Sequence, residues 1–346
     1  MFKIAKATKT LICIGTGGVG KTTLAASLGV GFANEGKKVL VLTIDPSQRL
    51  AQALGIKMDG ELHQVRVSGK GQLWSCVINH QTTFEYFIRA GSNQNNEAVD
   101  QLLKNRLYQQ LSGRLSGSQD FTSLVSLYRY VSSEDYDLVI LDTPPSQHTW
   151  NFLRAPEKIS NLFNEGIAKW FRDIDGEKTG VFKKILNLGT AQVLKALETL
   201  TGSQFIKELS AFFQAIQKWQ KPLENYVMNC HRLLTSSATE FVLVTALDPS
   251  RLAEAQKLSR EIKTQGYQLT SLIINRVPIW LNTNTNGDSA RINELLAYYK
   301  SLESDLYDRL THFKNQLKVY KCKELRQNSE DVTSLQNNYN EIVQVD

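Results

Sequence analysis

Residues 10–23 read TLICIGTGGVGKTT. This segment matches the pattern G-x-x-x-x-G-K-[ST], which here follows an apolar run and precedes a helix-like run. The pattern predicts a phosphate-binding loop, whose glycines let backbone N–H groups converge on an anion at the positive end of a helix. The alternative is a glycine-rich turn that only joins a strand to a helix. The predicted nucleotide contacts in this loop are Gly15, Thr16, Gly17, Gly18, Val19, Gly20, Lys21, Thr22 and Thr23.

Four side chains are candidates for phosphate chemistry. Lys21 is predicted to neutralise charge on the β- and γ-phosphates and to act in catalysis, and the Thr22 hydroxyl is predicted to ligate Mg²⁺. Asp142 ends the apolar run LVILD and is the second predicted metal residue, which would hold a magnesium-bound water. Asp45 also ends an apolar run and is the predicted catalytic residue that orients or deprotonates the attacking water. Its alternative role is to cap a helix or to form the turn before Pro46.

Short apolar and β-branched runs recur along the chain, each bounded by Gly or Pro or followed by a helix-like stretch. Near-continuous apolar runs are typical of strands that are covered on both faces. The sequence therefore predicts the α/β fold of a P-loop NTPase, with a mostly parallel sheet flanked by helices. The predicted strands are residues 10–15, 39–45, 73–79, 137–142, 241–248 and 269–277.

Helical spacing dominates between some of these strands. We predict a single P-loop ATPase domain over residues 1–346, with an α-helical insertion subdomain from residues 84–130 and 150–237. The nucleotide-binding core would then comprise residues 1–83, 131–149 and 238–346. Apolar stripes at three- and four-residue steps occur within 182–200 and 205–223. These stripes either pack on each other or form a groove for an apolar client.

The composition excludes several other classes of protein. The chain has 346 residues, 42% of them hydrophobic, and a formal charge of +6 from 40 basic and 34 acidic residues without long basic runs. We therefore expect no nucleic-acid partner. The sequence contains no apolar stretch of about 18 residues and no secretory leader pattern, so we expect a cytoplasmic protein. Its four cysteines are widely spaced and are expected to be reduced thiols.

Four segments together resemble the ArsA/GET family of MinD-like ATPases, which includes arsenite-pump ATPases and tail-anchored-protein targeting factors. They are GTGGVGKTT (15–23), DPSQRL (45–50), DTPPSQHT (142–149) and LIINRV (272–277). The resemblance implies that ATP and Mg²⁺ are the cofactors, that 45–50 and 142–149 are the two switch segments, and that Asn275 contacts the adenine. It also implies a dimeric switch, whose helical insertion binds a hydrophobic protein client or a membrane protein partner.

The loop departs from the family pattern at Thr16. Related ATPases carry a lysine at this position, which reaches across the dimer to the partner's nucleotide, and threonine carries no charge. We therefore expect slow hydrolysis by a homodimer, or a heterodimer with a paralogous ATPase that supplies the lysine. The segment 280–288 lacks the C-x-x-C that holds a dimer-bridging zinc in the targeting factors.

Other functions remain open at this point. The chain could be the ATPase subunit of an arsenite or anion efflux pump, although its scattered cysteines form no evident arsenite site. It could be a positioning ATPase like ParA or MinD, although the C-terminal residues NNYNEIVQVD are not a basic amphipathic helix. It could also be a weakly active scaffold that binds nucleotide without rapid turnover.

Overall fold

The computed structural model describes residues 1–44, 48–92, 96–104, 119–143, 151–155, 219, 221–278, 290–314, 316–324 and 331–345. The chain separates into two compact units. The first comprises Met1–Ile78, Leu127–Asn151 and Leu233–Asp346, and the second comprises Asn79–Ser126 and Phe152–Arg232. Each unit is described by itself.

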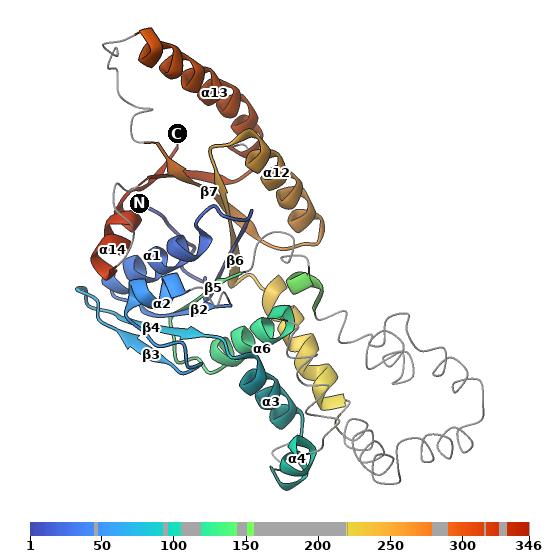
Figure 1. Ribbon diagram of the computed structural model, residues 1–346. Coiled ribbons are helices and arrows are strands. Elements are labelled where there is room, and N and C mark those ends of the chain that lie inside the picture. The colour runs from blue at the N-terminus through green and yellow to red at the C-terminus, as the bar shows by residue number, and fades with distance from the viewer. Residues whose placement is uncertain are drawn as a thin grey trace, which may run out of the picture. The chain divides into compact units, whose positions relative to one another are not determined.

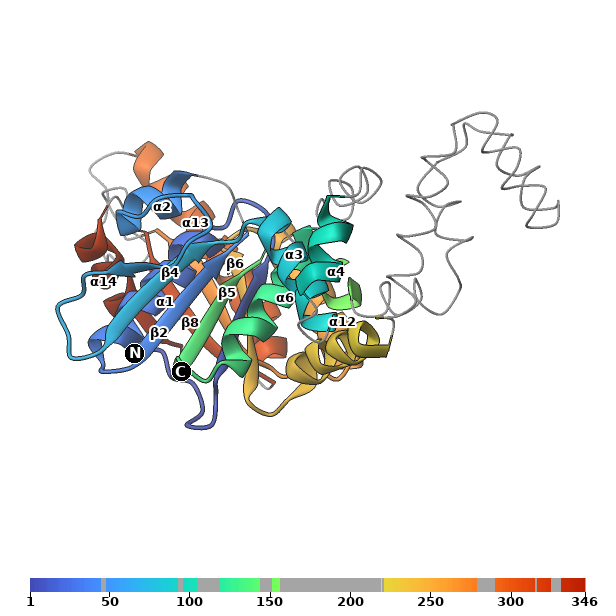
Figure 2. The ribbon, with the colours of Figure 1, turned by 90° about the horizontal axis from the view of Figure 1, so that it is seen from below.

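The first unit is built on a nine-stranded sheet, in the order β3-β4-β2-β5-β1-β6-β7-β8-β9. The neighbours from β4 to β8 pair in parallel, and the edge strands β3 and β9 pair antiparallel to β4 and β8. Figure 2 shows β4, β2 and β5 side by side. The strands are β1 (Thr10–Gly15), β2 (Lys38–Thr43), β3 (His63–Val65), β4 (Gln72–Val77), β5 (Leu138–Asp142), β6 (Thr239–Ala246), β7 (Leu269–Val277), β8 (Lys318–Lys323) and β9 (Ile342–Gln344).

Helices cover both faces of this sheet. In Figure 1, α1 and α14 lie on one side of it and α12 on the other. Alternate strand residues such as Leu11, Cys13 and Val41 join one buried cluster with α1 and α14. The residues between them, such as Ile12 and Leu40, are also fully buried, which explains the near-continuous apolar runs. The helices of this unit are α1 (Lys21–Asn34), α2 (Gln48–Leu54), α12 (Pro249–Thr264), α13 (Ala290–Lys314) and α14 (Val332–Asn340).

Helix α14 packs closely on α1. A Cβ added to Gly31 of α1 would collide with the ring of Tyr339, so only glycine allows this approach. Beneath the contact, Asn338 Nδ2 donates to Ser27 Oγ at 3.0 Å, and Cys322 Sγ donates to Asn338 Oδ1 at 3.0 Å. A short buried hydrogen-bonded chain therefore joins α1, α14 and β8.

The described part of the second unit is helical. It contains α3 (His80–Gly91), α4 (Asn96–Leu103), most of α6 (Gln119–Ser132) and the helical residues 221–232. Asn79 caps α3 by accepting from the backbone N–H groups of Gln81 and Thr82. Aromatic rings hold these helices together: the Phe87 ring lies edge-on to those of Phe121 and Tyr226, with centroids 4.9 and 5.4 Å away.

The predicted α/β fold with a mostly parallel sheet is confirmed. Each of the six predicted strands is present within two residues of its expected bounds. Strands β3, β8 and β9 were not predicted, because they are short or carry few apolar residues. The apolar stripe within 182–200 lies outside the described residues. From the second stripe, Trp219 and Leu223 are described, and both are buried.

Candidate nucleotide-binding site

The predicted phosphate loop joins the carboxyl end of β1 to α1. In the sheet, β1 lies between β5 and β6, so the chain leaves β1 toward one half of the sheet and later returns on its other side. Such a reversal of strand order is where α/β proteins bind ligands. The loop backbone requires glycine, because Gly15, Gly18 and Gly20 have φ angles of 153°, 75° and 83°. A Cβ on Gly15 would also overlap the backbone of Val244.

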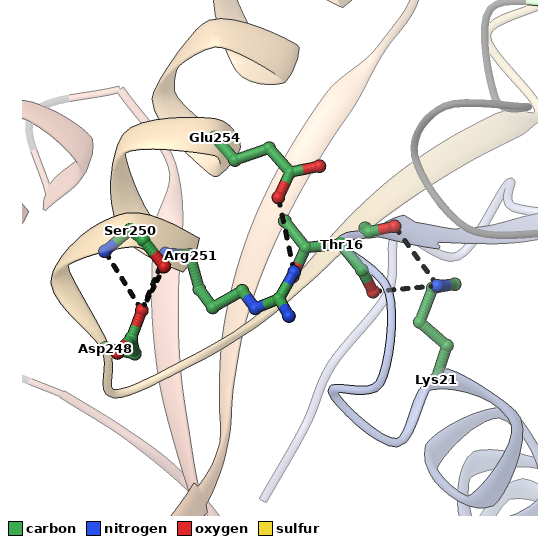
Figure 3. Close-up of polar contacts among 7 residues, drawn as sticks. Thr16, Lys21, Asp248, Ser250, Arg251 and Glu254 are labelled. Atoms are coloured by element: carbon green, nitrogen blue, oxygen red, sulfur yellow. Dashed lines mark hydrogen bonds and ion pairs between the residues drawn. The ribbon is translucent and has the colours of Figure 1, made fainter.

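Lys21 is held against the loop by hydrogen bonds to backbone carbonyls. Its Nζ donates to the carbonyl oxygens of Gly15 at 3.1 Å and Thr16 at 3.0 Å, as Figure 3 shows. The side chain is 7% exposed. An ammonium group that is largely withdrawn from water interacts strongly with an added anion. The geometry therefore fits the predicted contact with phosphate.

The N-terminus of α1 differs from those of α3, α12 and α14. Side chains of Asn79, Asp248 and Asp331 cap the other three helices, and Figure 3 shows bonds that the Asp248 carboxylate accepts. In α1 the N-cap is Gly20, which provides no side-chain acceptor. A helix start without such a cap presents backbone N–H groups and a positive dipole end to a bound anion.

Asp142 lies at the carboxyl end of β5, next to the phosphate loop. The parallel register places it opposite Cys13 of β1 and Thr43 of β2. The hydroxyls of Thr22 and Thr43 donate to its Oδ2 at 2.6 and 3.1 Å, and the residue is 1% exposed. Burial, and secondarily the charge of Asp142, raises the pKa of the Cys13 thiol, which therefore stays protonated.

The predicted metal residues Thr22 and Asp142 are thus in direct contact. Carboxylate and hydroxyl oxygens are the ligands that Mg²⁺ prefers, and a site with few protein ligands leaves room for water and phosphate oxygens. The donor set therefore fits Mg²⁺. Thr43 is a further member of this cluster that the sequence motifs did not identify.

The carboxyl end of β7 contacts the phosphate loop through two adjacent residues. Asn275 Nδ2 donates to the carbonyl of Val19 at 2.8 Å, and Arg276 Nη1 donates to the carbonyl of Gly18 at 3.2 Å. Asn275 is the predicted adenine contact. Arg276 was not predicted as a site residue, although it follows Asn275 directly in the same motif.

Thr16 occupies the loop position at which the family resemblance implies a lysine. Its side chain is fully buried, and its hydroxyl has no hydrogen-bond partner in the part of the chain that the structure describes. Among the other predicted contacts, Val19 is buried, and the Thr23 carbonyl accepts from Ser27 Oγ at 2.9 Å. The predicted catalytic residue Asp45 and switch residues 144–149 lie outside the described residues.

Comparison with known proteins identifies the family. The model of the anion-transporting ATPase family, ArsA_ATPase, matches residues 8–338, nearly the whole chain. The chain belongs to the ArsA ATPase family. The resemblance inferred from the four motifs is therefore confirmed, and nucleotide binding and ATPase activity are properties of this family.

Two Aspergillus proteins named ATPase get3 align with about three quarters of this ArsA-family chain. It is similar to the ATPase get3 of Aspergillus terreus (strain NIH 2624 / FGSC A1156), with 26% identity over 263 residues, covering 76% of this chain and 71% of the relative. The ATPase get3 of Aspergillus niger (strain ATCC MYA-4892 / CBS 513.88 / FGSC A1513) is 25% identical with the same coverage. Within the described residues, no helix of this ArsA-family member has the length and apolarity needed to span a bilayer.

Proposed function

We propose that the chain binds Mg-ATP at the Gly15–Thr22 loop and hydrolyses it, and that it works as a dimeric switch of ArsA/GET type. The observation that carries this proposal is the convergence of Lys21, Thr22, Asp142 and Asn275 on one loop at the strand-order reversal of the sheet. A cation, metal-ligand oxygens and a side chain that can recognise a base thereby meet at one loop.

Each residue has a distinct task in this proposal. Lys21 exchanges its bonds to loop carbonyls for the β- and γ-phosphate oxygens and neutralises their charge. Thr22 would hold Mg²⁺ directly and Asp142 through a bound water, and the ion would offset charge on the phosphate oxygens. Asp45 orients the attacking water, and Asn275 selects adenine; both of these roles come from the family resemblance.

Thr16 determines how two such subunits would cooperate. A buried, uncharged side chain cannot extend a positive charge to the nucleotide of a partner subunit. We therefore propose slow turnover by the homodimer, or faster turnover in a heterodimer with a paralogue that carries the lysine. Dimerisation itself is proposed from the family.

The client side of the switch is proposed for residues 84–130 and 150–237, which the sequence pattern predicts to be helical insertions. These segments are inserted between strands of the nucleotide-binding unit, as expected for a region that responds to nucleotide state. A switch requires that the two nucleotide states differ in affinity for the client. We propose an apolar protein segment, such as that of a membrane protein, as this client.

ATP hydrolysis by the purified full-length chain tests the proposal. We expect Mg²⁺-dependent release of phosphate that is lost in Lys21→Ala and Asp45→Asn but retained in Lys57→Ala, an exposed lysine outside the loop. Asp45→Asn should still bind ATP. Equal turnover by the wild type and Lys21→Ala would contradict the proposal. Fast turnover per subunit by a purified monomer, independent of protein concentration, would contradict the dimer.

The family description favours one second candidate, the ATPase subunit of an anion pump. Against it, all four cysteines are buried, and three of them lie on different strands: Cys13 on β1, Cys76 on β4 and Cys322 on β8. Arsenite or antimonite added to the same assay decides between the two functions. A severalfold stimulation would favour the pump subunit, and an unchanged rate would favour the client switch.

A further inference from the structure

The carboxyl end of β7 has an unusual backbone. Arg276 has a φ angle of 55°, which lies in the left-handed region that residues other than Gly, Asn and Asp seldom adopt. The pairing with β8 is irregular at the same place: Ile274 pairs with Lys321 and Val277 with Lys323, so two residues of β7 face one residue of β8. This is a β-bulge, and bulges redirect side chains at functional sites.

The bulge determines where the two side chains lie. In a regular strand, adjacent residues point to opposite faces of the sheet. Here Asn275 and Arg276 are adjacent, yet both donate to the phosphate loop, to the consecutive carbonyls of Val19 and Gly18 at 2.8 and 3.2 Å. Backbone strain at Arg276 therefore accompanies the placement of its guanidinium at the loop.

The guanidinium also lies over Gly20. From the position that a Cβ of Gly20 would take, Arg276 Nε is 3.7 Å and Nη2 3.9 Å away, and Asn275 Nδ2 is 2.7 Å away. Arg276 therefore lies at the same stretch of the loop as the predicted adenine contact Asn275, because the two side chains bind consecutive loop carbonyls.

A guanidinium has all its N–H donors in one plane, so it can bind a carbonyl with its edge and still stack with its flat faces. The Arg276 side chain is exposed, whereas Asn275 is 5% exposed. We propose that Arg276 is a specificity residue of the nucleotide site, which stacks its guanidinium on the purine base of bound ATP while its edge fixes the Gly18 carbonyl. This inference rests on the proposed binding of ATP.

Calorimetric titration with ATP and with inorganic tripolyphosphate, both with Mg²⁺, tests the inference, because tripolyphosphate has no base. We expect Arg276→Ala to weaken ATP binding about 5- to 30-fold, the effect of losing a cation–π contact of about 1–2 kcal/mol. Its affinity for tripolyphosphate should change less than about 2-fold. Arg276→Lys keeps a donor for the Gly18 carbonyl but loses the flat face, so it should behave more like Arg276→Ala than like the wild type.

Two further variants control for folding and for surface charge. Arg276→Gly removes the guanidinium and also the backbone strain, so it should fold at least as well as the wild type and repeat the selective loss of ATP affinity. Arg260→Ala removes an exposed arginine of α12 and should bind both ligands normally.

The possible outcomes separate this inference from the proposed function. Unchanged ATP affinity in Arg276→Ala would overturn the role of Arg276 alone. Equal losses for ATP and tripolyphosphate would also overturn it, because Arg276 would then act only through the loop. A wild-type chain that binds neither ligand would overturn the ATPase proposal together with this inference.

Discussion

Helix α1 has two ends with different neighbours. At its N-terminus, Lys21 and Thr22 are bonded to loop carbonyls and to the buried Asp142, in an arrangement that fits a phosphate and a cation. From the middle of the helix onward, Ser27 bonds to Asn338, and Gly31 is covered by the ring of Tyr339. One end holds polar groups for a ligand, and the other is fixed by packing.

This difference separates chemistry from stability along a single helix. Burying the charge of Lys21 costs free energy that its hydrogen bonds to loop carbonyls offset only in part, so the N-terminal end gains less from folding than the packed half does. The packed half instead excludes water from apolar and hydrogen-bonded groups, which stabilises the fold. Substitutions at the two ends should therefore affect different measurements.

The largest effect should follow from Lys21→Ala. Loss of one charge-stabilising group should lower the rate of ATP hydrolysis about 100- to 1000-fold. The melting temperature should stay equal or rise, because a mostly buried ammonium is removed. Phosphate release and thermal unfolding of the same preparation check both expectations. A large fall in the melting temperature would show that the two ends are not separable in this way.

Gly31→Ala is expected to lower the stability of the fold and to leave ATP binding nearly unchanged. The added methyl must displace the Tyr339 ring, and overpacking of this kind costs about 1–3 kcal/mol of unfolding free energy, against a gain of about 1 kcal/mol in helix propensity. Affinity for ATP should change less than about 2-fold. Urea unfolding measures the first quantity and calorimetry the second.

A double variant provides the control. Tyr339→Leu leaves room for the methyl, so Gly31→Ala should cost less in that background than in the wild type. If the cost is the same in both backgrounds, the ring contact is not its cause.

The smallest effect concerns pH and Cys322 beneath α14. Burial, and secondarily the charge of Glu341, raises the pKa of this thiol from 9.0 to about 12. Below pH 9 both states keep the proton, but between pH 9 and 12 the unfolded chain loses it while the folded chain does not. Stability should therefore fall as pH rises through this window, by about 1 kcal/mol at pH 10 from this group.

Urea unfolding at pH 8 and pH 10 measures the loss. Cys322→Ala should lose about 1 kcal/mol less stability than the wild type between these two values, with unchanged affinity for ATP. Identical pH dependence in both proteins would show that Cys322 does not titrate differently in the folded and unfolded states.

The parts of the site that the sequence predicts are those fixed by local geometry. Lys21 and Thr22 follow a strand and open a helix, so their place at the loop follows from the motif itself. Asp142 ends another apolar run, and carboxyl ends of parallel strands meet at one edge of a sheet, so its proximity to Thr22 was also predictable.

Other features depend on contacts that no local pattern encodes. In a regular strand, the side chain of Arg276 would lie on the other face of the sheet from Asn275, and the bulge brings it to the loop. No glycine in the sequence marks this bulge. Gly31 reads as a weak helix residue until Tyr339 is known to cover it. Strand β8 mixes lysines with its apolar residues and so has no continuous apolar run, and β9 has only three residues, so neither is recognised alone.

The position of α14 also has a consequence for the order of folding. Ser27 and Asn338 are bonded across a sequence separation of 311 residues. Such distant pairings form late, because a long loop must close before they contribute stability. During synthesis, the helix that follows the phosphate loop is made among the first residues, but the face that α14 covers, around Gly31, stays open until residues 331–345 leave the ribosome. The first unit therefore completes its core only after translation of the second unit, which can begin folding first.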